Sequence, residues 1–239
     1  MSPEPPAVPT VDSPITDLTD QRVIQILSTE HWSLLSARSL AYNEAFTRGG
    51  MFLTFLSTSF VALALFSTAM SFGDDFLTVA AVVLGFDFVI GLATYGRITG
   101  ANVDDLRAVH GMARIRHSYT QIAPIVEPYF TAATHDDIES VLTAYGGTSD
   151  SATGSLLYAM TTSGGMIALI VAMVGGVLAA ILGLLIGIPG EFAVWIGVGG
   201  GVLVFGVIVA ATFGGVTRTQ ENLTVTFPAP GREGSTRDR

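Results

Sequence analysis

The chain has 239 residues, of which 49% are hydrophobic, and its formal net charge at pH 7 is −9. Its mean hydropathy of +0.56 is high for a soluble domain, and its negative charge argues against a nucleic-acid partner. Because it contains neither cysteine nor lysine, disulfides, thiolate metal sites, cysteine nucleophiles and lysine-dependent catalysis are excluded.

The N-terminal fifth of the chain has two parts. Residues 1–15 are acidic and rich in proline, which predicts a disordered tail and not a signal peptide. Residues 16–48 contain no proline or glycine and carry apolar residues at spacings of three and four, which predicts an amphipathic helix that ends before Gly49 and Gly50. This helix is expected either to lie along the inner membrane surface or to pack on a neighbouring cytoplasmic helix, and the mixture of acids and arginines on its polar face favours packing.

Four apolar runs follow, each of about 20 residues, which is the length that crosses the hydrocarbon core of a bilayer as an α-helix. Short loops join the first run to the second and the third to the fourth. The sequence therefore predicts an all-α membrane protein with four transmembrane helices in two hairpins, at 51–95 and 164–215, accompanied by amphipathic cytoplasmic helices. The four runs are Met51–Met70, Phe76–Tyr95, Gly165–Ile186 and Phe192–Phe213.

The segments outside the hairpins are too short for a large soluble domain. Within residues 97–162 we expect a helix over 102–123, capped by Asn102, and a shorter one over 136–145, followed by a linker rich in Gly, Ser and Thr at 148–155. Residues 216–239 are predicted to be a tail that is disordered from Phe227 onward.

The eleven arginines predict the orientation in the membrane. None of them lies in the hairpin loops, Ser71–Asp75 and Gly187–Glu191, which carry acids instead. The positive-inside rule then places both termini and residues 97–162 in the cytoplasm and both loops outside. The use of arginine alone is typical of a GC-rich bacterial genome, so we expect the bacterial plasma membrane.

Asp87 lies near the middle of the second apolar run, where an acid costs about 2.5–3.5 kcal/mol on insertion scales. Two interpretations stay open. It is either a cation- or proton-handling carboxylate in an ion path, or a structural aspartate bonded to Ser57, Thr58 or Ser59. The same hairpin carries hydroxyls and phenylalanines that are candidates for lining and constricting such a path: Thr54, Ser57, Thr58, Phe52, Phe55 and Phe66.

The second hairpin is different, because small residues recur every four positions along both of its runs. Such ridges let helices approach closely, within one chain or between copies. In the hairpin loops, Asp74, Asp75 and Glu191 are candidates for an outer acidic ring that concentrates cations in an oligomer. The candidate helix-packing residues are Gly175, Ala179, Gly183, Gly187, Gly197 and Gly201.

The four histidines do not predict a metal centre. His110 and His117 are seven residues apart, and His135 precedes Asp136 and Asp137. Solvated histidines and a helix cap are favoured over a metal site here. We also expect no cofactor and no enzymatic activity, because the chain carries no catalytic or nucleotide-binding motif.

Two stretches carry a resemblance to known proteins. The first is LSTEHWSLLSARSL at 27–40, and the second is RIRHSY at 114–119 with EPYF at 127–130. With them the chain resembles a group of uncharacterised actinobacterial four-span integral membrane proteins over residues 17–215. In architecture it is also similar to SLATT-type membrane effectors, whose cytoplasmic helices flank a hairpin of spans. These resemblances imply the fold and no activity.

Two functions fit these observations. The leading hypothesis is a small oligomeric membrane channel or pore that conducts cations or protons, with the first hairpin along the path and the second facing lipid or neighbours. The alternative is a non-conducting scaffold or accessory subunit of a larger bacterial membrane complex, in which Asp87 is a structural bond. Membrane lipid and further copies of the chain are the expected partners.

Overall fold

The computed structural model describes residues 17–70, 73–143 and 162–231. Over these ranges the chain is all-helical, and four of its helices are long and apolar enough to cross a membrane, as the sequence predicts. After α2 come a 3-10 helix, η1 (Pro124–Tyr129), and a short helix, α3 (Ile138–Leu142). The four long helices are α1 (Gln21–Met70), α2 (Asp74–Ile122), α5 (Ser163–Leu185) and α6 (Gly190–Glu221).

The helices α1 and α2 are unbroken from end to end, with 50 and 49 residues. Each is therefore about 75 Å long at about 1.5 Å per residue. The helix expected to end before Gly49 continues through it, and the helix expected to begin at Asn102 is a continuation of α2. Glycine costs about 1 kcal/mol in a helix, but packing overrides that preference, and Gly49 lies on the buried side of α1.

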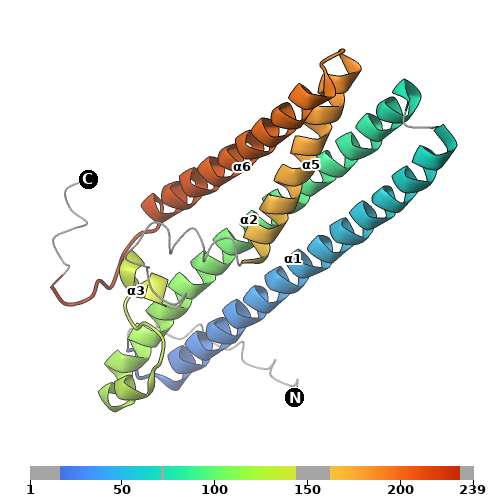
Figure 1. Cartoon of the computed structure of the whole chain (residues 1–239). Coiled ribbons are helices and arrows are strands. Elements are labelled where there is room, and N and C mark those ends of the chain that lie inside the picture. Colours follow the sequence, from blue (N-terminus) through green and yellow to red (C-terminus); the bar gives the residue numbers. More distant parts are fainter. Residues whose placement is uncertain (1–16, 71–72, 144–161, 232–239) are drawn as a thin grey trace, which may run out of the picture.

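A seam of buried residues joins α1 to α2. Along α2 the buried positions advance by alternating steps of four and three over 36 residues, and α1 carries a matching series from Ala45 to Leu63. This period of 3.5 residues is that of a left-handed coiled coil, and the two helices run antiparallel side by side (Figure 1). The seam residues of α2 are Ala80, Leu84, Asp87, Gly91, Thr94, Ile98, Ala101, Asp105, Ala108, Met112 and Ile115.

The helix α2 lies between α1 and α5, and α6 packs mainly on α5. The main apolar core is formed by α1, α2 and α5, with Ile208 as the buried contribution of α6. The outer sides of α1 and α6 are covered with exposed apolar side chains, among them Phe60, Trp195 and Val202. A lipid bilayer would cover such a surface, which is otherwise too apolar for water.

Glycines allow the tight packing of α5 on α6. At Gly176 a Cβ atom would lie 2.6 Å from the carbonyl oxygen of Gly197, so a side chain there is incompatible with this approach. The turn between the helices also needs glycine, because Gly187 has φ of +86° and its N–H donates to the carbonyl of Leu184. Gly187, one of the six candidate helix-packing residues, is therefore required by the turn between α5 and α6.

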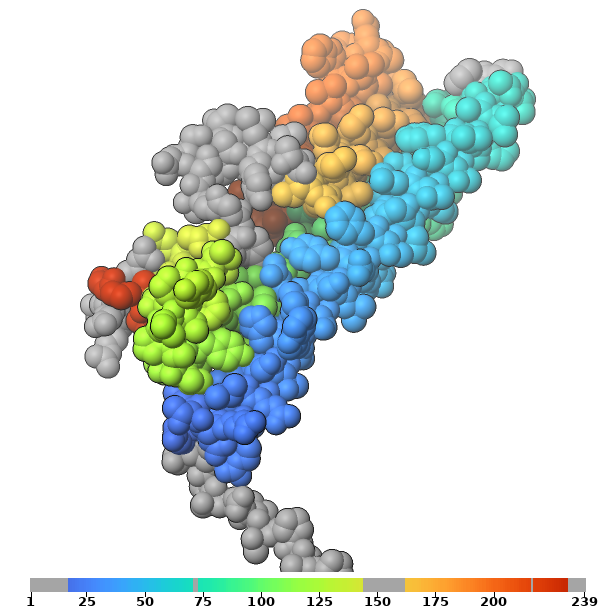
Figure 2. Space-filling model, turned by 90° about the horizontal axis from the view of Figure 1, so that it is seen from below, coloured from blue at the N-terminus to red at the C-terminus, as the bar shows by residue number. Residues whose placement is uncertain are grey.

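The parts of α1 before Arg48 and of α2 after Arg97 extend beyond the predicted spans. Together with η1, α3 and residues 222–231 they form a structure that we call the stalk (Figure 2). It has its own apolar core of Leu106, Val109, Met112, Ala113 and Val141, packed against Leu34 of α1 and Leu223 beyond α6.

The stalk corrects two expectations. Phe227 and Ala229, expected in a disordered tail, bind instead to the loop before α3, and Thr224 binds Arg114 of α2. The helix predicted over 136–145 begins only at Ile138, because Asp137 caps it. The predicted tail at 1–15, the linker at 148–155 and the chain end at 232–239 lie outside the described residues.

Candidate functional site

Asp87 is fully buried in the α1–α2 seam, midway along the second predicted span. The hydroxyl of Ser59 donates to its Oδ1 atom at 3.0 Å. The Oδ2 atom has no hydrogen-bond partner among the described residues. One turn to either side along the seam, Leu56 and Leu84 are buried in the apolar core. The carboxyl group is thus closed off from both lipid and water.

The hydroxyl groups predicted to line a path lie elsewhere. Thr54, Ser57 and Thr58 are exposed on the outer side of α1. Each hydroxyl donates to a carbonyl four residues earlier in its own helix, at 2.8 to 3.0 Å. This bond satisfies a hydroxyl that faces an apolar surrounding. The three side chains therefore make a stripe that points away from Asp87.

The three phenylalanines are divided in the same way. Phe52 is buried, and its ring fills the space left by Gly91 of α2, beside Val171 of α5. Phe55 and Phe66 are 46% exposed on the outside of α1. Within one chain the three rings do not meet around a common axis, so they form no constriction there.

The acidic residues that the sequence places in the hairpin loops lie instead at the starts of helices. Asp74 and Asp75 are in the first turn of α2, and Glu191 is in the first turn of α6. Both turns lie at the end of the molecule that is opposite the stalk (Figure 1). Carboxylates in these positions interact favourably with the helix dipole.

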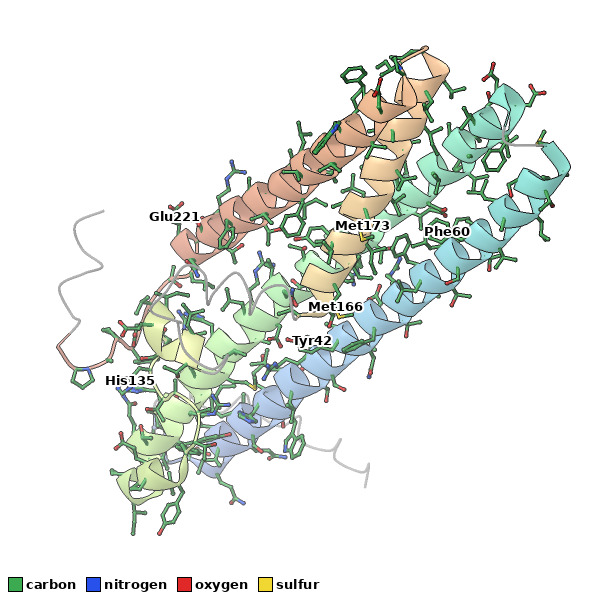
Figure 3. All side chains as sticks on the ribbon, in the orientation of Figure 1. Tyr42, Phe60, His135, Met166, Met173 and Glu221 are labelled. Carbon is green, nitrogen blue, oxygen red and sulfur yellow. The ribbon has the colours of Figure 1, made fainter. Side chains whose placement is uncertain are left out.

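A second buried aspartate holds the stalk together. Asp105 of α2 is almost completely buried, and the guanidinium of Arg38 on α1 donates to both of its oxygens. The hydroxyl of Tyr42, on the side of α1 toward α2, donates to Oδ2 at 3.1 Å (Figure 3). Sequence reasoning did not single out Asp105, which lies in the 3.5-residue series of buried positions along α2.

A cluster of three charged residues, Glu44, Arg48 and Arg97, lies at the border between the stalk and the predicted spans. Glu44 accepts hydrogen bonds from Arg48, at 3.0 Å, and from two nitrogens of Arg97 on α2, at 3.1 and 2.6 Å. The hydrogen bonds from Arg97 and Arg48 lower the pKa of Glu44 to about 2. One anion is thus shared by two cations, which leaves a net positive charge at this level.

A further polar network centres on Asp136, in the loop before α3. Its buried carboxylate accepts hydrogen bonds from Arg114 Nε at 2.8 Å and from the backbone N–H groups of Thr226 and Phe227 at 2.8 and 2.6 Å. In return the backbone N–H of Asp136 donates to the carbonyl of Phe227 at 3.1 Å. Although burial raises it, these hydrogen bonds hold the pKa of Asp136 below its usual range.

The neighbouring side chains complete this attachment, which we call the clasp (residues 114, 136–137 and 224–229). Arg114 also donates to the backbone carbonyl of Thr224, and Asp137 accepts from the N–H of Ala229 at 3.1 Å. The ring of His117 stacks on Phe227 at a centroid distance of 4.4 Å. The clasp therefore ties the segment after α6 to α2 and α3.

The expectation of solvated histidines is wrong for His110. Its side chain is buried, and its Nε2 atom lies 3.8 Å from Asp136 Oδ2 without a hydrogen bond. Burial and the charge of Arg114 lower the pKa of His110. The expected helix cap is confirmed, because Asp137 accepts the N–H of Ser140 at 3.1 Å.

Comparison with known proteins adds no constraint: no protein family, curated protein or solved structure matches the chain. The resemblance to actinobacterial membrane proteins stays a prediction.

Proposed function

We propose that the chain is a multi-pass protein of the bacterial plasma membrane that acts as a non-conducting scaffold or accessory subunit, with its stalk and both termini in the cytoplasm. The continuous α1–α2 seam is the observation that carries this proposal. It extends from the spans into the stalk and contains Asp87 and Asp105 as bonded members. The same pair of helices thus anchors the chain and projects from the bilayer.

Closure of the seam argues against conduction through a single chain. Asp87 is enclosed by packed side chains, and the hydroxyls of Thr54 and Ser57 point outward. Ions need a continuous run of polar groups or water to cross the bilayer. The polar groups of the first hairpin are instead separated onto two opposite sides of α1.

The stalk offers apolar side chains for a protein partner. On α1, Ile26, Trp32 and Leu40 are 63%, 65% and 71% exposed, and around η1 Ile125 and Tyr129 are even more so. A group of exposed apolar side chains is unfavourable in water, unless it lies at the border of the membrane. A scaffold would cover them with another subunit of its complex.

The proposal is tested in purified full-length protein and in native membranes. Flux liposomes should stay silent under changes of voltage, pH and tension. Ile26→Ser and Trp32→Ser should decrease the size of the complex extracted from native membranes and leave the melting temperature of the purified chain unchanged. Arg107→Gln, on the exposed side of α2, is the matched control. Ion flux in liposomes, or complexes of unchanged size, would contradict the scaffold.

The orientation has its own test. Reporters placed after Arg239 and at Asp74 should lie on opposite sides of the membrane, because all arginines avoid the two hairpin turns. Reporters found on the same side would contradict the cytoplasmic stalk, whichever function the chain has.

One observation favours the second candidate, an oligomeric channel. The outward stripe of Thr54, Ser57 and Thr58 on α1 has spacings of three and four residues from Thr54 and is uncovered in one chain. Several copies arranged around an axis would turn this stripe into a hydroxyl-lined path. Because the chain has no cysteine, Ser57→Cys provides a clean probe. Crosslinking of copies at that position, together with flux that a thiol reagent blocks, would support the channel and overturn the scaffold.

A further inference from the structure

A groove of about 760 Å³ lies on α1 and α2 where the stalk meets the spans. Its walls change character along its length. At the stalk end lie Glu44 and Arg48, and toward the spans lie Met51, Phe55 and Ile90. Apart from Leu40, the stalk end of the groove is therefore polar, whereas the other end is apolar, and this change coincides with the border predicted for the bilayer.

The charge at the polar end is positive. Glu44 is bonded to both Arg48 and Arg97, so two guanidinium groups face one carboxylate. Arg48 donates to Glu44 through Nε, and its side chain is 54% exposed. The terminal nitrogens of Arg48 take no part in that bond, and they are donors suited to a phosphate oxygen.

We propose that this groove binds an anionic glycerophospholipid of the adjacent leaflet, with the phosphate on Arg48 and one acyl chain along Met51, Phe55 and Ile90. A soluble anion would make no contact with the apolar half of the groove. A zwitterionic lipid would place its own cationic group next to the net positive charge at the polar end. The inference goes beyond the scaffold and the channel, and it depends on neither.

Full-length protein in mixed micelles tests the proposal, with phosphatidylglycerol and phosphatidylcholine competing in native mass spectrometry. The wild type should retain phosphatidylglycerol preferentially. Arg48→Gln should decrease its affinity about fivefold, which corresponds to about 1 kcal/mol for one basic residue at a membrane surface. Arg107→Gln is the matched control, because this arginine is exposed on the stalk and paired to Asp104. Its affinity should stay at the wild-type value.

Glu44→Gln separates binding from folding, because it removes the acid and leaves both arginines. It should increase phosphatidylglycerol retention, which a variant that merely unfolds would not do. Phe55→Ser should decrease retention of the lipid without changing the preference between head groups. Equal retention of the two lipids by the wild type, or equal retention by Arg48→Gln and Arg107→Gln, would overturn the proposal.

Discussion

Ser59 and Asp87 face each other across the α1–α2 seam, with Ser59 Oγ 3.0 Å from Asp87 Oδ1. This is the one hydrogen bond that the Asp87 side chain makes among the described residues, since Oδ2 is unpartnered. Polar bonds between membrane helices are modest, about 0.6 kcal/mol on average and up to about 1.7. The Ser59–Asp87 hydrogen bond is thus a specific contact between α1 and α2, and it contributes only a small part of the free energy of unfolding.

Removal of Ser59 should therefore destabilise the helix pair. For Ser59→Ala we expect a loss of about 1–2 kcal/mol in the free energy of unfolding, because a buried carboxyl group keeps no partner. Ser57→Ala is the matched control, since its hydroxyl is exposed and bonds to its own helix at Leu53. Equilibrium unfolding in detergent measures both. Equal losses in the two variants would mean that the seam bond contributes nothing.

Substitution of Asp87 itself separates structure from conduction. Asp87→Asn keeps the shape and can still accept from Ser59, so we expect stability within about 0.5 kcal/mol of the wild type. Asp87→Leu should lose about 1–2 kcal/mol, because the Ser59 hydroxyl is left unpaired. Flux liposomes made with Asp87→Asn provide the functional readout. A change in conductance or ion selectivity with a folded protein would assign Asp87 to an ion path.

The contact between α5 and α6 should be sensitive at Gly176. A Cβ atom there would lie 2.6 Å from the carbonyl oxygen of Gly197, which is backbone and cannot move aside independently. We expect Gly176→Ala to cost about 1–3 kcal/mol, as overpacking does. Gly199→Ala is the control, because no atom lies within 4 Å of its Cβ position. Thermal unfolding in one detergent compares the two, and a neutral Gly176→Ala would contradict the close approach.

Much of the architecture could be predicted from the sequence, because apolar runs of spanning length depend on composition alone. The continuity of α1 and α2 was missed, since Gly49 and Asn102 are local signals that tertiary packing overrides. The alternation of four and three residues from Ala80 to Ile115, which includes both Asp87 and Asp105, is a pattern of burial in the structure. Nearly every residue of the second apolar run is apolar, so the local sequence does not mark which positions form the seam.

The clasp could not be predicted in the same way. Asp136 binds backbone N–H groups of Thr226 and Phe227, which are 90 and 91 residues away. Backbone donors leave no mark in the identity of their residues, so no pattern in the tail indicates the contact. Burial of His110 follows from the same long-range packing, and for that reason local sequence suggested a solvated side chain.

The stalk should become less stable as the pH falls below about 6.5. Burial and the charge of Arg114 lower the pKa of His110 in the folded protein below its ordinary value of 6.5. The unfolded chain then binds the proton first, so the stability due to neutral His110 is complete above pH 6.5 and is lost as the pH falls toward the folded pKa. Thermal unfolding between pH 7.5 and about 5 measures the loss, and His110→Gln should flatten part of this dependence. A melting temperature that is equal across this range in the wild type would contradict the burial.

Loss of the Asp136 carboxylate should release the segment after α6 from the stalk. In Asp136→Ala the guanidinium of Arg114 loses its buried partner, and the N–H groups of Thr226 and Phe227 lose their acceptor. Removing one member of a fully buried ion pair costs about 3–5 kcal/mol, and the cost here is smaller because the Arg114 side chain is 34% exposed. We therefore expect residues 224–229 to exchange their amide hydrogens much faster, while the spans keep their protection. Asp104→Ala is the control, because its pair with Arg107 is exposed and such pairs contribute about 0–1 kcal/mol. Unchanged exchange at 224–229 in Asp136→Ala would show that the segment is held by its apolar contacts, such as the one between Phe227 and His117, and not by the carboxylate.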